Sequence, residues 1–371
     1  MNACRVGFVL CSSVEHAIPS TRIAVLNMLP FLRTAGIEPC ILFEPPRPNE
    51  WPDLAGVAER ALEAGCEAVV LQKVRGTSAV ALARQLAAAG VPTIYVVCDL
   101  VDVPMVEATD VTVTVTEYLK SLYPKRLHSR IHIVHDGIER PDIYKNEWGS
   151  LEADTATPLK AVLVTSAALD RLPVLGSPPA WLSVRIVGRY DRGMNRWRAV
   201  RWKWAVQPPG EHFEYLRFLM DRHIKCVPWD PENVYREMTQ ADIGIIPIET
   251  PADEPSVDAS HSWKNKSENR LTLKMSIGLP VIATPIPSYE AVIEHGVNGF
   301  FAHSSRDWET CLSALRDPAR RKEMGKAARA SVIKKYSTQE QAARFVHVLR
   351  AVSVFAPLSG DPLVNPGGIS A

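Results

Sequence analysis

Six consecutive residues, NKSENR at 265–270, combine two cationic side chains with hydroxyl and amide groups. Lys266 and Arg270 could neutralise the two charges of a diphosphate, while Ser267 and Asn269 could hydrogen-bond to its oxygens or to a ribose. A solvated helix terminus would also explain the charges, but cations are unfavourable at the start of a helix dipole. We therefore favour an anion-binding site, in which Arg270 also stabilises a departing phosphate.

Further polar residues stand where buried strands are expected to end. Asp99 follows the apolar run at 92–98, and Lys73 follows the run at 67–72. A carboxylate at the end of a strand could remove the proton from an attacking hydroxyl or bind a sugar hydroxyl. Capping of a following helix explains Asp99 equally well. Asp99 is thus a candidate catalytic residue, and Lys73 is a candidate contact of an acceptor substrate.

The segment CSSVEHAIPSTR at 11–22 lies where the first strand is expected to meet its helix. Ser13, His16 and Arg22 could contact the same acceptor, and Arg22 could also bind a phosphate. Lone histidines are more often structural, and Ser20 is better explained as the N-cap of the helix.

Two turns in the second half of the chain offer hydrogen-bond donors. Thr165 and Ser166 end the apolar run LKAVLVTS and could donate to a pyrophosphate. Ser288, Tyr289 and Glu290 begin an expected helix, whose free N–H groups and dipole would favour an anion. Capping of that helix by Ser288 is an equally good explanation.

Short apolar runs alternate with helical patterns along the chain, which is typical of βαβ units and a parallel sheet. Strands are expected at 5–10, 38–43, 67–72, 92–98, 110–115 and 130–135, and again at 159–166, 182–188, 225–229, 241–248, 279–285 and 299–303. Helical segments that close on a glycine are expected at 20–36, 54–65 and 78–90. The predicted fold class is α/β, with two tandem Rossmann-like doubly wound domains and an inter-domain cleft.

The pattern breaks near residue 150, where a polar stretch separates the two sets of strands. The expected units are a first domain at 1–145, a linker at 146–158, a second domain at 159–335, a C-terminal helix at 336–354 and a tail at 355–371. Ligands should bind in the cleft that faces the carboxyl ends of both sheets.

Composition and charge bound the class of protein. The 371 residues are 46% hydrophobic and 22% charged, a composition that excludes a disordered chain. The formal net charge is only +1, so the chain as a whole has no electrostatic attraction to nucleic acid. Seven scattered cysteines without a CxxC pair indicate reduced thiols. The first residues lack the apolar region of a signal peptide, and no stretch approaches the roughly 20 apolar residues of a membrane span. We expect a cytoplasmic protein, with peripheral contact at the inner face of a membrane left open.

One segment, 189–206, concentrates basic and aromatic side chains. Its members are Arg189, Arg192, Arg196, Arg198, Arg201 and Lys203, with Trp197, Trp202 and Trp204. This composition suits a contact with anionic lipid or stacking on nucleic acid. A surface element with buried tryptophans is the explanation we favour.

Residues 241–302 resemble the donor-binding half of GT-B glycosyltransferases, in the large retaining group-1 (GT4-like) family. GLPVIAT at 278–284 and EHGVNGFF at 294–301 carry the most specific part of the resemblance. The stretch at 111–139 resembles the end of that family's first domain, and YSTQEQAARFVHVL at 336–349 resembles the helix that crosses back onto it. The resemblance implies a GT-B fold whose first domain binds an acceptor and whose second binds a nucleotide-sugar donor.

The sequence departs from the family's donor motif. That motif has two glutamates separated by seven residues, and the corresponding positions hold Asn265 and Leu273, with Glu268 out of register with both. The family's glycine-rich loop after the first strand is absent too. The donor is therefore expected to be held by the KSENR segment.

The resemblance implies a glycosyltransferase of the hexosyltransferase type, which moves a sugar from a nucleotide-diphosphate sugar to a hydroxyl acceptor with retention, in polysaccharide or glycoside synthesis. The acceptor is a saccharide, a lipid-linked saccharide or a small molecule, and no specific nucleic acid partner is expected. We expect no cofactor and no metal, because DLVD at 99–102 is too widely spaced for a DxD motif. A nucleotide-sugar epimerase of the same fold and a catalytically silent nucleotide-sugar-binding or partner protein remain alternatives.

Overall fold

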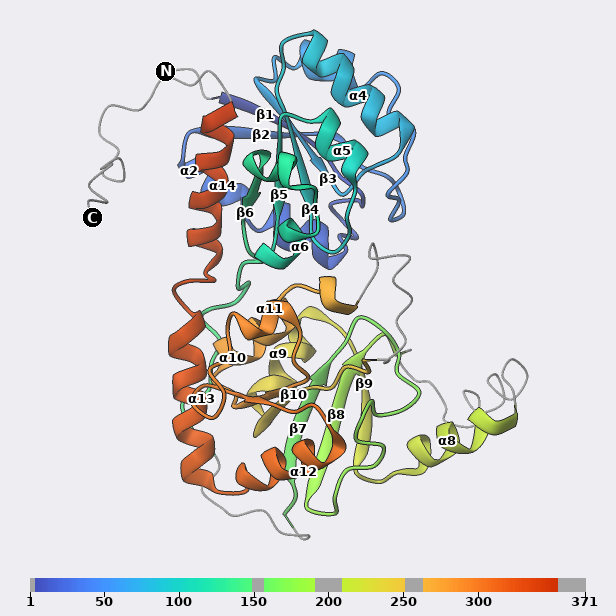
Figure 1. Ribbon diagram of the computed structural model, residues 1–371, viewed down its shortest axis with the longest axis vertical. Coiled ribbons are helices and arrows are strands. Elements are labelled where there is room, and N and C mark those ends of the chain that lie inside the picture. The colour runs from blue at the N-terminus through green and yellow to red at the C-terminus, as the bar shows by residue number, and fades with distance from the viewer. Residues whose placement is uncertain (1–3, 149–156, 191–208, 251–262, 353–371) are drawn as a thin grey trace.

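The computed structural model describes residues 4–148, 157–190, 209–250 and 263–352. The described chain forms two α/β domains, each built on a six-stranded parallel sheet (Figure 1). The predicted fold class, two tandem doubly wound domains, is confirmed. In Figure 1 the first domain lies above the second, and the last two long helices run down one side of both.

The first sheet has the strand order β2-β1-β3-β4-β5-β6. Its strands are β1 (Cys4–Val9), β2 (Ile37–Phe43), β3 (Ala68–Gln72), β4 (Thr93–Val97), β5 (Val111–Thr114) and β6 (Ile131–Ile133). Each lies in one of the expected apolar runs or within a residue of it. The chain order reverses between β1 and β3, and crossovers to opposite faces leave a crevice at the carboxyl ends of these two strands.

The second sheet has the strand order β12-β11-β10-β7-β8-β9. Its strands are β7 (Leu159–Val164), β8 (Leu182–Gly188), β9 (Ile224–Pro228), β10 (Ile243–Ile246), β11 (Val281–Ala283) and β12 (Phe300–Phe301). The order reverses between β7 and β10, which places a second crevice at their carboxyl ends.

The helices of the first domain follow the expected segments except at the start. They are α1 (Pro19–Thr21), the π-helical turn η1 (Arg22–Leu26), α2 (Leu29–Thr34), α3 (Val57–Glu63), α4 (Thr77–Ala88), α5 (Val103–Ala108), α6 (Glu117–Ser121) and the 3-10 helix η2 (Lys125–Arg130). The single helix expected over 20–36 is therefore wrong. Pro30 lies in the first turn of α2 and has no N–H to continue a helix from the preceding turn. The expected N-cap at Ser20 is wrong too, because Ile18 is the N-cap of α1.

The second domain has helices both between its strands and after the last strand. They are α8 (Pro209–Met220), α9 (Pro231–Thr239), the 3-10 turn η4 (Trp263–Asn265), α10 (Asn269–Ile277), α11 (Pro287–Glu290), α12 (Ser305–Ala314) and α13 (Pro318–Val332), followed by α14 (Thr338–Val352). α10 ends on Gly278, whose φ of 88° is the left-handed conformation that glycine adopts without strain. Capping of α11 by Ser288 is wrong, because its N-cap is Ile286. None of the described helices is long and apolar enough to cross a bilayer.

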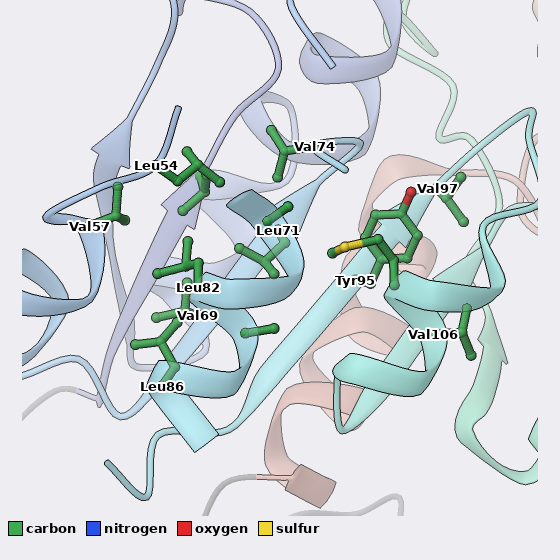
Figure 2. Packing of buried hydrophobic residues seen from close by; sticks show 14 of the residues in the cluster. Leu54, Val57, Val69, Leu71, Val74, Leu82, Leu86, Tyr95, Val97 and Val106 are labelled. Carbon is green, nitrogen blue, oxygen red and sulfur yellow. The ribbon is translucent and has the colours of Figure 1, made fainter. Parts of the chain in front are cut away.

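Both faces of the first sheet are buried, as a doubly wound fold requires. On one face, Val69 and Leu71 of β3 pack in a single cluster with Leu82 of α4 (Figure 2). Tyr95 of β4 and Val106 of α5 extend the same cluster. These five side chains are at most 1% exposed, so the strand ends that carry polar residues stand on a rigid base.

α14 belongs to the core of the first domain, although it follows the second domain in the sequence. Phe345 and Leu349 are buried in the same cluster as Phe8 of β1, and Figure 1 shows α14 beside α2 and β6. The chain thus crosses between the domains twice. The two crossings meet in a parallel bridge between Ile138 and Ser337.

Candidate functional site

A cleft of about 680 Å³ lies between the two domains. It opens at the carboxyl ends of both sheets, where the segments after β1, β3, β4 and β6 face those after β7, β8 and β9. These ends include the points where the strand order of each sheet reverses, the positions at which α/β folds bind ligands. Most of the residues singled out in the sequence line this cleft.

The second domain supplies positive charge to the cleft. Lys266, Arg270 and Arg189 line it, and none of the three has a carboxylate within ion-pair distance among the described residues. Nη2 of Arg270 donates a hydrogen bond to Oγ of Ser166 across 3.2 Å, which ties the start of α10 to the end of β7. Cations without counter-charges in such a cleft make a site for an anionic ligand.

Three other residues predicted to contact the donor also line the cleft. Thr165 accepts a hydrogen bond from the N–H of Ala167 at 3.2 Å, and Asn269 stands in the first turn of α10. Ser267 donates its proton to Oδ2 of Asp136 in the first domain, at 2.7 Å. Its hydroxyl proton is therefore engaged between the domains, although the residue still lines the cleft.

The cations of the first domain are paired with carboxylates. Nζ of Lys73 lies 2.9 Å from Oδ1 of Asp99 and 3.1 Å from Oε1 of Glu50. Nε of Arg22 lies 2.7 Å from Oε1 of Glu139. Within the described ranges the two faces of the cleft therefore differ: the cations that the second domain places in the cleft have no carboxylate partner, and those of the first domain do.

Lys73 holds Asp99 as an anion. Burial alone would raise the pKa of Asp99, but the ammonium groups of Lys73 and, more weakly, Lys266 outweigh burial and lower that pKa below its usual value. Lys73 has a φ of 58°, an uncommon conformation for a residue with a side chain and one that recurs at functional sites. Asp102, rather than Asp99, caps α5 by accepting the N–H of Met105 at 3.0 Å, so the capping explanation for Asp99 is wrong.

Asp136 is a buried carboxylate in the cleft that sequence reasoning missed. It follows β6 at the end of the apolar run 130–135, a position equivalent to that of Asp99 after β4. Burial, with the negative charges of Glu268 and Asp99, raises its pKa to about 7 despite the hydrogen bond from Ser267. A polar residue directly after a strand was the signal that could have found it.

Arg22 closes one side of the cleft. Its guanidinium carbon lies 5.5 Å from the ring centroid of Trp229, which follows β9 in the second domain. Glu139 fixes Arg22 with two hydrogen bonds and accepts a third from Nδ2 of Asn27 at 2.9 Å. Trp229 and Glu139 were also missed, because neither belongs to a motif that their local sequence reveals.

Five predicted site residues lie outside the lining of the cleft. Ser13 and His16 are joined locally, since Oγ of Ser13 accepts the N–H of His16 at 3.1 Å. Ser288 and Tyr289 are buried in the second domain, and Glu290 is exposed beside them.

The positions at which the sequence departs from the donor motif have distinct surroundings. Leu273 lines the cleft with an apolar side chain, and Asn265 is buried. Glu268 turns toward the first domain, where Oε1 lies 2.6 Å from Nδ1 of His135. Neither Asn265 nor Glu268 is among the cleft-lining residues.

Some predictions lie outside the described residues. These are the basic and aromatic segment from 191 onward, with its three tryptophans, most of the expected linker, and the tail. Within the described ranges, no group of three or more His, Cys, Asp or Glu side chains could hold a metal ion. The expected absence of a metal and a cofactor stays a prediction.

Comparisons with known proteins agree with this architecture. Residues 182–347 match the family model described as glycosyl transferase-like. Anabaena HepE in complex with UDP has a TM-score of 0.64 at 13% identity, over 94% of this chain and 100% of that one. A glycosyltransferase from Rickettsia africae has a TM-score of 0.63 at 12% identity, over 95% and 99%. The lipopolysaccharide outer core galactosyltransferase WaaB has a TM-score of 0.59 at 10% identity, over 94% and 99%.

Among curated proteins, none matches the chain in sequence. The structural likenesses, all at low identity, establish the two-domain fold, while the family match covers most of the second domain. The chain therefore has the two-domain GT-B fold of these glycosyltransferases, and its residues 182–347 match a glycosyl transferase-like family model.

Proposed function

We propose that the protein transfers a sugar from a nucleoside-diphosphate sugar bound on the second domain to a hydroxyl acceptor bound on the first, with retention of configuration. The observation that carries this proposal is the unequal pairing of cations across the cleft. Lys266 and Arg270 have no carboxylate partner in the described part of the chain, whereas Lys73 and Arg22 do.

The unpaired cations explain why the donor would bind to the second domain. A nucleoside-diphosphate sugar carries two negative charges, and its leaving group gains more as the glycosidic bond breaks. Arg270, held by Ser166, and Lys266 would contact the diphosphate and favour its departure. This role needs only side chains of the protein, and we propose that transfer proceeds without a metal or cofactor.

The paired residues of the first domain suit an acceptor hydroxyl. Asp99, held as an anion by Lys73, would accept a hydrogen bond from the hydroxyl and orient it toward the sugar. In a retaining transfer the departing phosphate oxygen takes the hydroxyl proton on the same face. Asp99 then orients the acceptor, and Arg270 stabilises the phosphate.

The first donors to test are uridine nucleotides, because HepE structures hold UDP and UDP-glucose. Purified protein would be incubated with UDP-, GDP- and ADP-sugars, with and without a panel of saccharide acceptors. Release of the nucleoside diphosphate and formation of a product with an unchanged anomeric configuration, seen by mass spectrometry and NMR, would support the proposal. Binding without release in any combination would favour a silent nucleotide-sugar-binding protein.

We also propose a peripheral contact with anionic membranes through the second domain. The sequence at 189–203 carries six basic residues, and α8 follows it in the chain. α8 exposes Phe213 and Met220, which are 73% and 67% accessible and lie two turns apart on one side of the helix. Sedimentation with vesicles containing phosphatidylglycerol, but not with pure phosphatidylcholine vesicles, is expected. Equal sedimentation with both, or none with either, would contradict it.

A further inference from the structure

Two consecutive residues of the first domain bond to two consecutive residues of the second. Nδ1 of His135 lies 2.6 Å from Oε1 of Glu268, and Oγ of Ser267 donates to Oδ2 of Asp136 at 2.7 Å. We call these four residues the junction. All four residues are half-buried or buried, and the Glu268 side chain is only 2% exposed. Such contacts are shielded from water and hold their partners more strictly than surface pairs do.

His135, in the first-domain half of the junction, is also held by the segment that follows α13. The backbone N–H of His135 donates to Oε1 of Gln341 at 2.9 Å, and its ring packs edge-on against Tyr336 with centroids 5.0 Å apart. Tyr336 and Gln341 belong to the segment in which the chain returns to the first domain. Beside them, the N–H of Ile138 donates to the carbonyl of Tyr336 at 2.8 Å. His135 therefore has a fixed position where the two crossings meet.

The second-domain half of the junction sets the start of α10. Glu268 is the N-cap residue of that helix, and its carbonyl accepts the N–H groups of Leu271 and Thr272, each at 2.9 Å. Lys266 precedes it by two residues, and Arg270 follows it by two. Any shift of Glu268 therefore moves the cations that face the cleft.

We propose that His135 and Asp136 are positioning residues for the donor site, because their bonds to Glu268 and Ser267 hold residues 266–270 where Lys266 and Arg270 meet the diphosphate. This rests on the proposed function. Neither residue needs to touch the donor. The bonds of the junction fix the position of a segment in which Asn265 and Leu273 stand where the family's motif has its two glutamates.

The first test measures hydrogen exchange of the backbone amides of 266–271 in the full chain without ligand. His135→Phe keeps the ring that packs on Tyr336 but removes the bond to Glu268. His128→Phe is the matched control, because Nε2 of His128 bonds to the carbonyl of Tyr123 within the first domain. Faster exchange at 266–271 in His135→Phe, but not in His128→Phe, is expected. Equal exchange in both would overturn the anchoring role, whether or not any nucleotide binds.

The second test measures the Kd of UDP, GDP and ADP by calorimetry. His135→Phe and Glu268→Leu should each weaken the best binder by about 5- to 30-fold, and the double variant should be no weaker than either, since both remove one bond. Glu268→Gln, which can still accept the hydrogen bond, should stay within about threefold of wild type. Additive losses in the double variant would overturn the proposal.

Two controls separate the possible failures. The melting temperature of His135→Phe shows whether this variant folds. If it does not, Ser267→Ala is used instead, because it removes only the neighbouring bond to Asp136. An unchanged Kd of Ser267→Ala would then contradict the proposal. Wild-type protein that binds none of the three nucleotides would refute the proposed function itself. In that case the exchange measurement still decides whether the junction holds 266–270 in place.

Discussion

The ammonium group of Lys73 lies 2.9 Å from the carboxylate of Asp99, and the two residues follow the ends of the neighbouring strands β3 and β4 by one and two positions. Lys73 reaches this position with a left-handed backbone and a second carboxylate, that of Glu50, on its other side. The pair neutralises charge on the first domain and keeps Asp99 ionised. The cations of the first domain that line the cleft are therefore paired, whereas Lys266 and Arg270 of the second domain have no carboxylate partner among the described residues.

Removing Lys73 should make the activity more sensitive to acid. Burial raises the pKa of Asp99 and Lys73 lowers it, so Lys73→Met leaves the burial effect opposed only by the weaker influences of Lys266 and of the hydrogen bond from Cys98 among the described residues. Asp99 then takes up a proton at a higher pH, and the acidic limb of kcat/KM moves to higher pH. The pH profiles of wild type and variant are the measurement. A limb that stays in place would show that Asp99 does not have to be ionised.

The two cations of the KSENR segment should bind the diphosphate independently of the acceptor. Arg270→Ala and Lys266→Ala should each weaken nucleoside-diphosphate binding by about 1.5 to 3 kcal/mol, as expected for a charge-assisted bond. Lys322→Ala, at an exposed position on α13, is the matched control and should leave the Kd unchanged. Titration calorimetry with UDP at two salt concentrations measures the effect. Unchanged affinity in both variants would remove these residues from the donor site.

Asp136 should make the folded state less stable as pH rises. Its pKa is about 7 in the folded protein and 3.8 in an exposed chain, so between these values the folded state binds more protons than the unfolded state. The free energy of unfolding therefore falls as pH increases through this window. Asp136→Asn keeps an acceptor for Ser267 but cannot ionise.

Urea unfolding of wild type and Asp136→Asn from pH 4.5 to 8 measures this dependence. The free energy of unfolding of Asp136→Asn should increase relative to that of wild type as the pH rises. Two stability curves that stay parallel over the whole range would mean that Asp136 is not perturbed.

Lys274 should make the folded state more stable as pH rises. It is fully buried on α10, its Nζ donates to the carbonyl of Arg270 at 3.2 Å, and burial lowers its pKa to about 7. Between about 7 and 10.5 the unfolded chain binds more protons than the folded protein, so stability rises with pH. Lys274→Met fills a similar volume without a charge, and it should be more stable than wild type at pH 6 and lose that advantage by pH 10. A variant that is less stable at pH 6 would contradict this account.

Much of the fold follows from the sequence because buried parallel strands and glycine helix ends leave strong local patterns. The apolar runs predicted all the strands of the two described sheets, and Gly36, Gly65 and Gly90 have the positive φ expected at helix ends. The exception is the first helix. Pro30 and a π-helical turn divide it, and helical periodicity alone does not reveal such a break.

The candidate site was only partly predictable. Residues just beyond strand ends, such as Asp99 and Ser166, could be placed because carboxyl ends of parallel strands share one edge of a sheet. Partners that meet across the domain boundary could not, because no local pattern indicates that His135 reaches Glu268 or that Arg22 reaches Trp229. Asp136 is a cleft carboxylate that sequence reasoning missed although the rule for strand ends could have identified it.

We propose above all that the second domain holds a nucleoside-diphosphate sugar through Lys266 and Arg270, and that this sugar is then transferred. The most direct measurement is the release of nucleoside diphosphate from a panel of nucleotide sugars, by wild type and by the Lys266→Ala/Arg270→Ala double variant, in the presence of saccharide acceptors. Release by wild type from at least one donor, with its loss in the double variant and not in Lys322→Ala, is the predicted result. Equal release by wild type and the double variant, or none by wild type with any donor, would contradict the claim.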